Sequence, residues 1–60
     1  MTQKYIEQIK SQIPAGERLD RMYKALEGDI RVITKNDRGW EKRYTTIYHP
    51  EDDSVTIKEF

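Results

Sequence analysis

Apolar residues near the start of the chain recur at helical spacing. They fall at positions i, i+3 and i+7, with one flanking aromatic: Ile6, Ile9, Ile13 and Tyr5. This pattern predicts a helix over about residues 3–12. Thr2 is the candidate N-cap, because its hydroxyl can accept a hydrogen bond from a free N–H of the first turn. Pro14 disfavours helical geometry at the residue before it, and Gly16 follows, so we expect the helix to end before them.

A second apolar stripe has the same period. Its members lie at i, i+3, i+4 and i+7: Leu19, Met22, Tyr23 and Leu26. Acidic residues precede basic ones by four positions, the favourable order on a helix, in the pairs Glu17–Arg21 and Asp20–Lys24. Gly28 suits the left-handed position that follows a helix C-terminus. These features predict a second helix over residues 15–27, with Leu26 buried.

Beyond Gly28 the period changes to two. Three β-branched or aromatic runs predict strands at residues 29–34, 40–48 and 54–60. The segments between them, 35–39 and 49–53, have turn compositions, and Gly39 can take a positive φ. We therefore expect a three-stranded antiparallel meander with residues 40–48 in the centre.

The strand register is predicted from the separation of apolar and polar side chains. Pairing Tyr48 with Val55, and Thr34 with Trp40 across a five-residue loop, collects the apolar residues on one face. That face comprises Ile30, Val32, Trp40, Tyr44, Tyr48, Val55 and Ile57. With both helices packed on it, the expected fold is a single α+β domain over residues 1–60, of order ααβββ.

Composition limits the class of protein. The chain has 60 residues, 11 basic and 11 acidic side chains, no cysteine and 35% hydrophobic residues. It contains no apolar run of about 20 residues that could span a bilayer, and no apolar leader of a signal peptide, so we expect a cytoplasmic protein without membrane contact. The small core favours a homodimer, which would bury additional surface.

Candidate catalytic chemistry is sparse, and we expect no enzyme, cofactor or metal site. His49 is the one histidine and precedes a proline in a predicted turn. Residues 51–53 are acidic but lack the alternating ligands and the glycine of an EF-hand loop. No phosphate-binding glycine loop or HExxH pair is present.

The hairpin over residues 35–44 supports a nucleic-acid alternative. Residues 29–49 carry a net charge of +2, against −3 for residues 50–60, and Trp40 could stack on a base. Overall neutrality and a pI near 6.6 weigh against this interpretation. A helix-turn-helix with a wing is also disfavoured, because Glu17 and Asp20 would face phosphate.

The favoured hypothesis is a small non-enzymatic binding or regulatory protein that acts through protein–protein contact. Its size suits an inhibitor or adaptor from a phage or mobile element. Strands 29–34 and 54–60 would leave unpaired edges, which invite pairing with another chain. The hairpin and the uncovered sheet face supply the candidate partner-binding residues: Arg31, Ile33, Arg38, Trp40, Arg43, Ile47 and Lys58.

Overall fold

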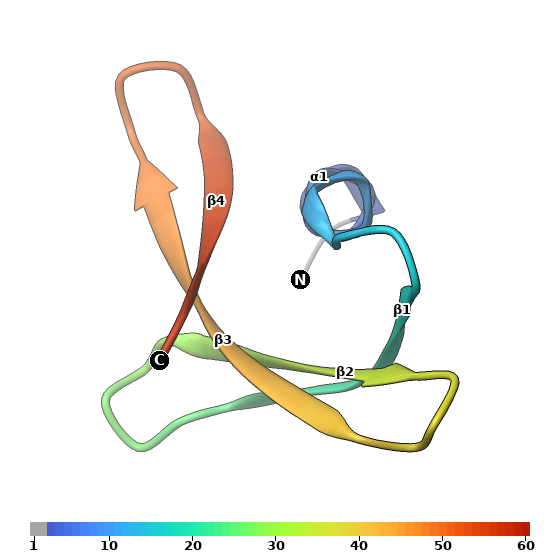
Figure 1. Ribbon diagram of the computed structural model, residues 1–60. Helices are drawn as coiled ribbons and strands as arrows, with labels where there is room; N and C mark the ends of the chain where they lie inside the picture. The colour runs from blue at the N-terminus through green and yellow to red at the C-terminus, as the bar shows by residue number, and fades with distance from the viewer. Residues whose placement is uncertain (1–2) are drawn as a thin grey trace.

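The computed structural model describes residues 3–60, so the predicted N-cap Thr2 lies outside the described residues. One helix precedes four strands: α1 (Gln3–Gln12), β1 (Glu17–Lys24), β2 (Ile30–Asn36), β3 (Glu41–His49) and β4 (Ser54–Glu59). The strands form an antiparallel sheet in the order β1-β2-β3-β4. Figure 1 shows that the sheet is strongly twisted, with the β1–β2 and β3–β4 hairpins crossing steeply and α1 lying on the concave side.

The predicted second helix over residues 15–27 is wrong, and the fold is αββββ rather than ααβββ. Residues 17–24 form β1, whose register against β2 shifts between Leu19 and Arg21. The extra residue, Asp20, reverses the alternation of faces, so Leu19 and Met22 both pack against the core although they are three positions apart. A strand with such a bulge therefore has core-facing apolar residues at i and i+3, the same spacing as on one face of a helix. Leu26 lies in the following turn and is fully exposed.

Two glycines allow the tight turns that precede and follow β2. Gly28 ends no helix; it has φ +98° and donates its N–H to the Ala25 carbonyl at 2.9 Å. Gly39 has φ +81°, which confirms its expected conformation, and donates to the Asn36 carbonyl at 3.0 Å. Because glycine has no Cβ, it adopts positive φ without steric cost.

One predicted strand register is confirmed and the other is shifted. Tyr48 pairs with Val55, as expected. Thr34 lies opposite Lys42 instead of Trp40, because the loop is shorter than the predicted five residues. The side-chain oxygen of Asn36 accepts hydrogen bonds from the backbone N–H groups of Arg38 and Trp40, at 2.9 and 3.0 Å, and this holds the tight loop. A shift of two residues leaves the two faces unchanged.

The core lies between α1 and the concave face of the sheet. Its buried members come from α1, β2, β3 and β4: Ile9, Val32, Tyr44 and Val55. Partly buried residues surround them: Tyr5, Leu19, Met22 and Ile57. Two residues predicted for this core are exposed: Trp40 lies at the end of the β2–β3 hairpin, and Tyr48 lies at the start of α1, with its ring centroid 6.2 Å from that of Tyr5. Trp40 is 68% exposed and Tyr48 is 54% exposed.

Side chains of α1 pair with the outer edge of β4. The N–H of Val55 donates to Gln8 Oε1 at 2.8 Å, and the N–H of Ile57 donates to Gln12 Oε1 at 2.9 Å. Gln12 Nε2 donates in turn to the Val55 carbonyl at 2.8 Å. The expected unpaired edges are therefore wrong on both counts: β4 is covered by α1, and β2 lies inside the sheet. The uncovered edge belongs to β1.

Candidate binding face

The sheet face that points away from α1 is rich in basic side chains, and we call it the open face. Alternation along the paired strands places six basic residues there: Arg18, Arg21, Arg31, Lys35, Arg43 and Lys58. The acidic Glu41 shares this face. Two rows run across the strands: the first contains Arg21, Ile33 and Arg43, and the second contains Tyr23, Arg31, Thr45 and Lys58.

An ion pair crosses β2 diagonally, from Arg21 in the first row to Glu41, which lies opposite Lys35. Arg21 Nη1 on β1 lies 3.2 Å from Glu41 Oε2 on β3, and its other acidic neighbour is Asp20, at 2.5 Å. The hydrogen bonds to Glu41 and then to Asp20 raise the pKa of Arg21 above its usual value. Ile33, between the two strands, is only 1% exposed. Ile33 was a predicted contact residue, and this burial removes it from the accessible surface.

Arg31 has an aromatic neighbour at the C-terminal end of the chain. Its guanidinium carbon lies 4.5 Å from the ring centroid of Phe60, and its Nη2 lies 3.7 Å from a carboxylate oxygen of Glu27. The Phe60 ring is 62% exposed, so the stacked pair presents an aromatic surface beside the second row. Sequence reasoning missed Phe60 as a site residue. The signal was its position two residues after Lys58, which places both on one face of an extended segment.

The other predicted contact residues separate into two groups. Arg43, Ile47 and Lys58 lie on the open face with Arg31, and all three are exposed. Arg38 lies in the loop after β2 and Trp40 follows it, so both are at the end of the hairpin instead of on the sheet face. Among residues 3–60, Arg18, Arg43 and Lys58 form no salt bridge, which leaves their charges available to a partner.

A polar cluster lies on the opposite side of the sheet, around Glu17. Its Oε1 accepts hydrogen bonds from the hydroxyls of Thr34 and Tyr44, at 2.8 and 2.9 Å, and its Oε2 lies 3.3 Å from Lys42 Nζ. These partners replace the predicted helical pair with Arg21. The hydrogen bond from Thr34 is the largest influence that lowers the pKa of Glu17. Burial, together with the hydrogen bond to Glu17, raises the pKa of Tyr44 to about 12. The cluster links three strands and fixes their ends.

A second carboxylate is held at the turn before β4. Asp53, with φ 56°, accepts hydrogen bonds from Lys4 Nζ at 2.7 Å, from the Tyr5 hydroxyl, and from the Tyr48 hydroxyl at 2.8 Å. The contact with Lys4 and the two hydroxyls hold the pKa of Asp53 well below its usual range. The hydrogen bond to Asp53 raises the pKa of Tyr48 to about 12. These contacts tie the start of α1 to the β3–β4 turn.

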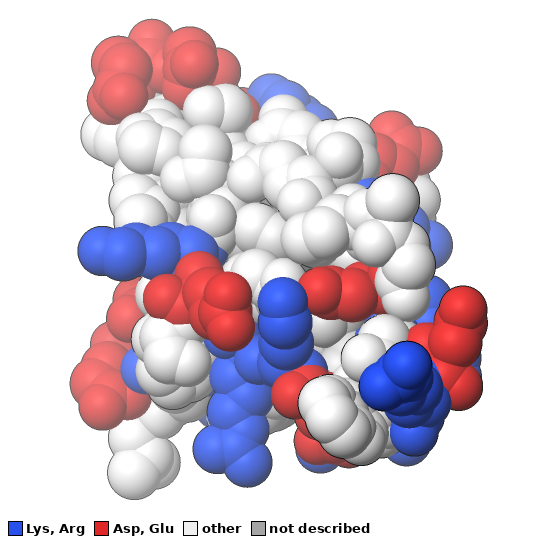
Figure 2. All heavy atoms as spheres, viewed as in Figure 1, with Lys and Arg blue, Asp and Glu red and all other residues white. Residues whose placement is uncertain are grey.

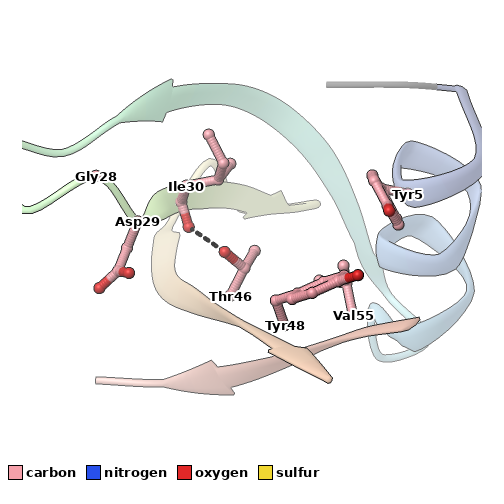
Figure 3. A pocket seen from close by; sticks show the side chains of 7 residues that line it. All are labelled: Tyr5, Gly28, Asp29, Ile30, Thr46, Tyr48 and Val55. Carbon is pink, nitrogen blue, oxygen red and sulfur yellow. Dashed lines mark hydrogen bonds between the residues drawn. The ribbon is translucent and has the colours of Figure 1, made fainter. Parts of the chain in front are cut away.

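A pocket of about 230 Å³ opens between α1 and the β1–β2 hairpin. Seven residues line it: Tyr5, Gly28, Asp29, Ile30, Thr46, Tyr48 and Val55. In Figure 3 the Thr46 hydroxyl donates a hydrogen bond to the Ile30 carbonyl, at 3.0 Å, and Tyr5 from α1 lies near Tyr48 from β3. Both tyrosine hydroxyls donate to Asp53. Most polar groups of the pocket thus serve the fold, and the open face is the stronger candidate site.

Charge is unevenly distributed over the molecule. Figure 2 shows acidic side chains gathered at the end of the β3–β4 hairpin and an uncharged area beside them, with mixed charges on the lower part. The acidic group corresponds to the turn at residues 51–53. Within residues 3–60, no group of three or more His, Cys, Asp or Glu residues is arranged to hold a metal ion. Over the same range, no helix has the length and apolar character needed to cross a membrane.

Comparison of the chain with protein-family models, with characterised proteins and with solved structures gives no match.

Proposed function

We propose that this chain is a small non-enzymatic binding protein whose open face contacts an acidic surface of a protein partner. The observation that carries the proposal is the pair of cross-strand rows, which bring the exposed Arg43 and Lys58 together on one sheet. Arg31 lies in the second of these rows but is mostly covered by Phe60 and Glu27. The backbone of a paired sheet is already ordered, so a partner that binds these side chains does not also have to order the main chain, which favours affinity.

The composition of the open face favours a protein partner. Exposed Tyr23, Ile47 and Phe60 stand among the arginines, and aromatic residues with arginine are the types enriched at protein interfaces. Glu41 and Asp20 already neutralise part of the basic charge through Arg21. The chain as a whole is neutral, so it provides little long-range attraction for a polyanion.

A nucleic-acid ligand is the second candidate function. Its support is the exposed ring of Trp40 beside Arg38, together with the aromatic rings of Tyr23 and Phe60 near Arg31. Such rings can stack on unpaired bases while arginines contact phosphates.

The test compares charge-reversal variants of the open face in two assays. Arg43→Glu and Lys58→Glu should each weaken capture of a partner from the native host, identified by mass spectrometry, while Lys10→Glu on α1 serves as the control of equal charge. Gel shifts with single- and double-stranded DNA and RNA at increasing salt test the second candidate. A shift that weakens steeply with salt, and is lost in the same two variants, would favour nucleic acid over protein.

A further inference from the structure

The uncovered edge of the sheet is β1, and its unpaired backbone groups can be identified. Ala25 N–H donates to the Asp29 carbonyl, so the alternation of antiparallel pairs directs the backbone groups of Met22 and Lys24 away from β2. On the other side of the bulge, the N–H of Asn36 donates to the Trp40 carbonyl and so points toward β3. The backbone groups of the preceding residue, Lys35, therefore point toward β1, where they face Arg18.

The bulge thus changes which backbone groups of β1 point away from β2. These outward groups are those of Glu17, Leu19, Met22 and Lys24. The four positions are symmetric about the centre of the strand, between Asp20 and Arg21. A second β1 placed antiparallel along this edge would set Leu19 opposite Met22 and Glu17 opposite Lys24. The outward backbone groups at these positions would find partners, apart from the N–H of Glu17, which already donates to the Pro14 carbonyl at 3.2 Å.

The side chains of β1 complement themselves in the same register. Asp20 lies opposite Arg21 of the second copy and Leu19 opposite Met22, while Arg18 lies against Tyr23. Lys24 lies opposite Glu17, whose carboxylate keeps its contacts with Thr34, Tyr44 and Lys42. Opposite charges and apolar pairs facing each other across strands are stabilising.

Neighbouring registers are unfavourable. A shift by one residue brings Asp20 against Asp20 in one direction and Arg21 against Arg21 in the other, and like charges directly opposite are destabilising. Charges and bulges usually protect sheet edges from pairing. Of these three registers, only the one with Asp20 opposite Arg21 brings opposite charges together, and it also aligns the outward positions 17, 19, 22 and 24 with one another.

We propose that two copies of this chain associate through antiparallel β1–β1 pairing to form a continuous eight-stranded sheet. The two-fold axis passes perpendicular to the sheet between Asp20 and Arg21. The other edge cannot serve in this way, because Gln8 and Gln12 already occupy it. Such an axis keeps both open faces on the same side, so the dimer doubles the area of the basic face. The pairing itself does not depend on what the open face binds.

Variants that reverse the charge at position 20 or 21 test this register. The wild-type chain should sediment at close to twice its 7.2 kDa mass. Asp20→Arg places two arginines opposite each other at two symmetric positions, and Arg21→Asp does the same with aspartates. Each variant should raise the dissociation constant by about tenfold or more, since two repulsive cross-strand contacts replace two attractive ones. An equimolar mixture should recover a heterodimer, because each arginine then faces an aspartate.

Two further variants separate pairing from folding. Arg21→Asp also removes the contact with Glu41, so circular dichroism must show that it folds. Lys24→Glu is exposed and sets two glutamates opposite each other, and it should weaken the dimer without this complication. Lys10→Glu, with the same charge change on α1, should leave the dimer intact. A wild-type chain that remains monomeric up to about 1 mM would overturn the proposal, as would dimers that tolerate both Asp20→Arg and Lys24→Glu.

Discussion

The backbone N–H of Val55 donates a 2.8 Å hydrogen bond to the side-chain oxygen of Gln8, as it would to a neighbouring strand. Gln12 repeats the arrangement at Ile57, two residues further along β4. Four residues of a helix rise about 6 Å, and two residues of a strand rise about 6.8 Å. The two spacings are similar enough for glutamines at i and i+4 to satisfy successive outward groups of the strand.

Replacing Gln12 with leucine should therefore destabilise the fold and uncover the β4 edge. The variant leaves the N–H of Ile57 and the carbonyl of Val55 without their partner, and each partly buried group left unsatisfied costs about 1–3 kcal/mol. Urea denaturation should detect this loss, and light scattering should show increased association. Gln3→Leu, at an exposed position of α1, provides the control. Equal stability of the two variants would mean that the glutamine contacts contribute little.

Ile9 and Leu26 should respond in opposite ways to truncation. Ile9 is completely buried, so Ile9→Ala should lower the free energy of unfolding by about 2–5 kcal/mol. Leu26 is fully exposed in the β1–β2 turn, so Leu26→Ala should change it by less than about 0.5 kcal/mol. Chemical denaturation measures both. A large loss for Leu26→Ala would instead support the helix over residues 15–27 that the sequence pattern favours.

Trp40→Ala should leave the fold nearly unchanged. The ring is 68% exposed at the end of the β2–β3 hairpin, and its backbone N–H keeps the hydrogen bond to Asn36 in the variant. The melting temperature should therefore stay close to that of the wild type. If the same variant loses nucleic-acid binding in gel shifts, the ring acts as a stacking platform. A large drop in melting temperature would show that the ring is packed in solution.

The contacts of Asp53 should make the stability of the fold depend on pH in the acidic range. Folding lowers the pKa of Asp53, so its ionised form contributes stability above the ordinary value of 3.8, and this contribution is lost as pH falls below it. Asp53→Asn should melt at a lower temperature than the wild type at pH 7, and the difference should begin to shrink as pH falls below about 4. Asparagine also tolerates the positive φ at this position.

A matched control identifies the source of that pH dependence. Asp37→Asn removes the same charge from the exposed β2–β3 loop, where the carboxylate forms no ion pair within residues 3–60. Its melting temperature should follow the wild type across the whole pH range. If Asp53→Asn also followed the wild type, the contacts with Lys4 and Tyr48 would not contribute to stability.

The location of the candidate site could be predicted only in part. Strand alternation correctly assigned Arg31, Arg43, Ile47 and Lys58 to one face, because the period of two is local and survives a register shift of two residues. Burial of Ile33 could not be predicted, since Ile33 lies between Arg21 of β1 and Arg43 of β3, and the sequence pattern predicts a helix where β1 lies. Phe60 became part of the site only when the twisted sheet brought it to Arg31.

The first helix, the turn between β3 and β4, and the pairing of Tyr48 with Val55 follow from the sequence alone, because each depends on neighbouring residues and a regular period. Only the tertiary structure decided the state of residues 17–24. Their apolar spacing fits either a helix or a strand with one extra residue, and local propensity does not separate the two. Pairing with β2 favours the strand, because it supplies backbone hydrogen bonds along residues 17–24 and places Leu19 and Met22 together against the core.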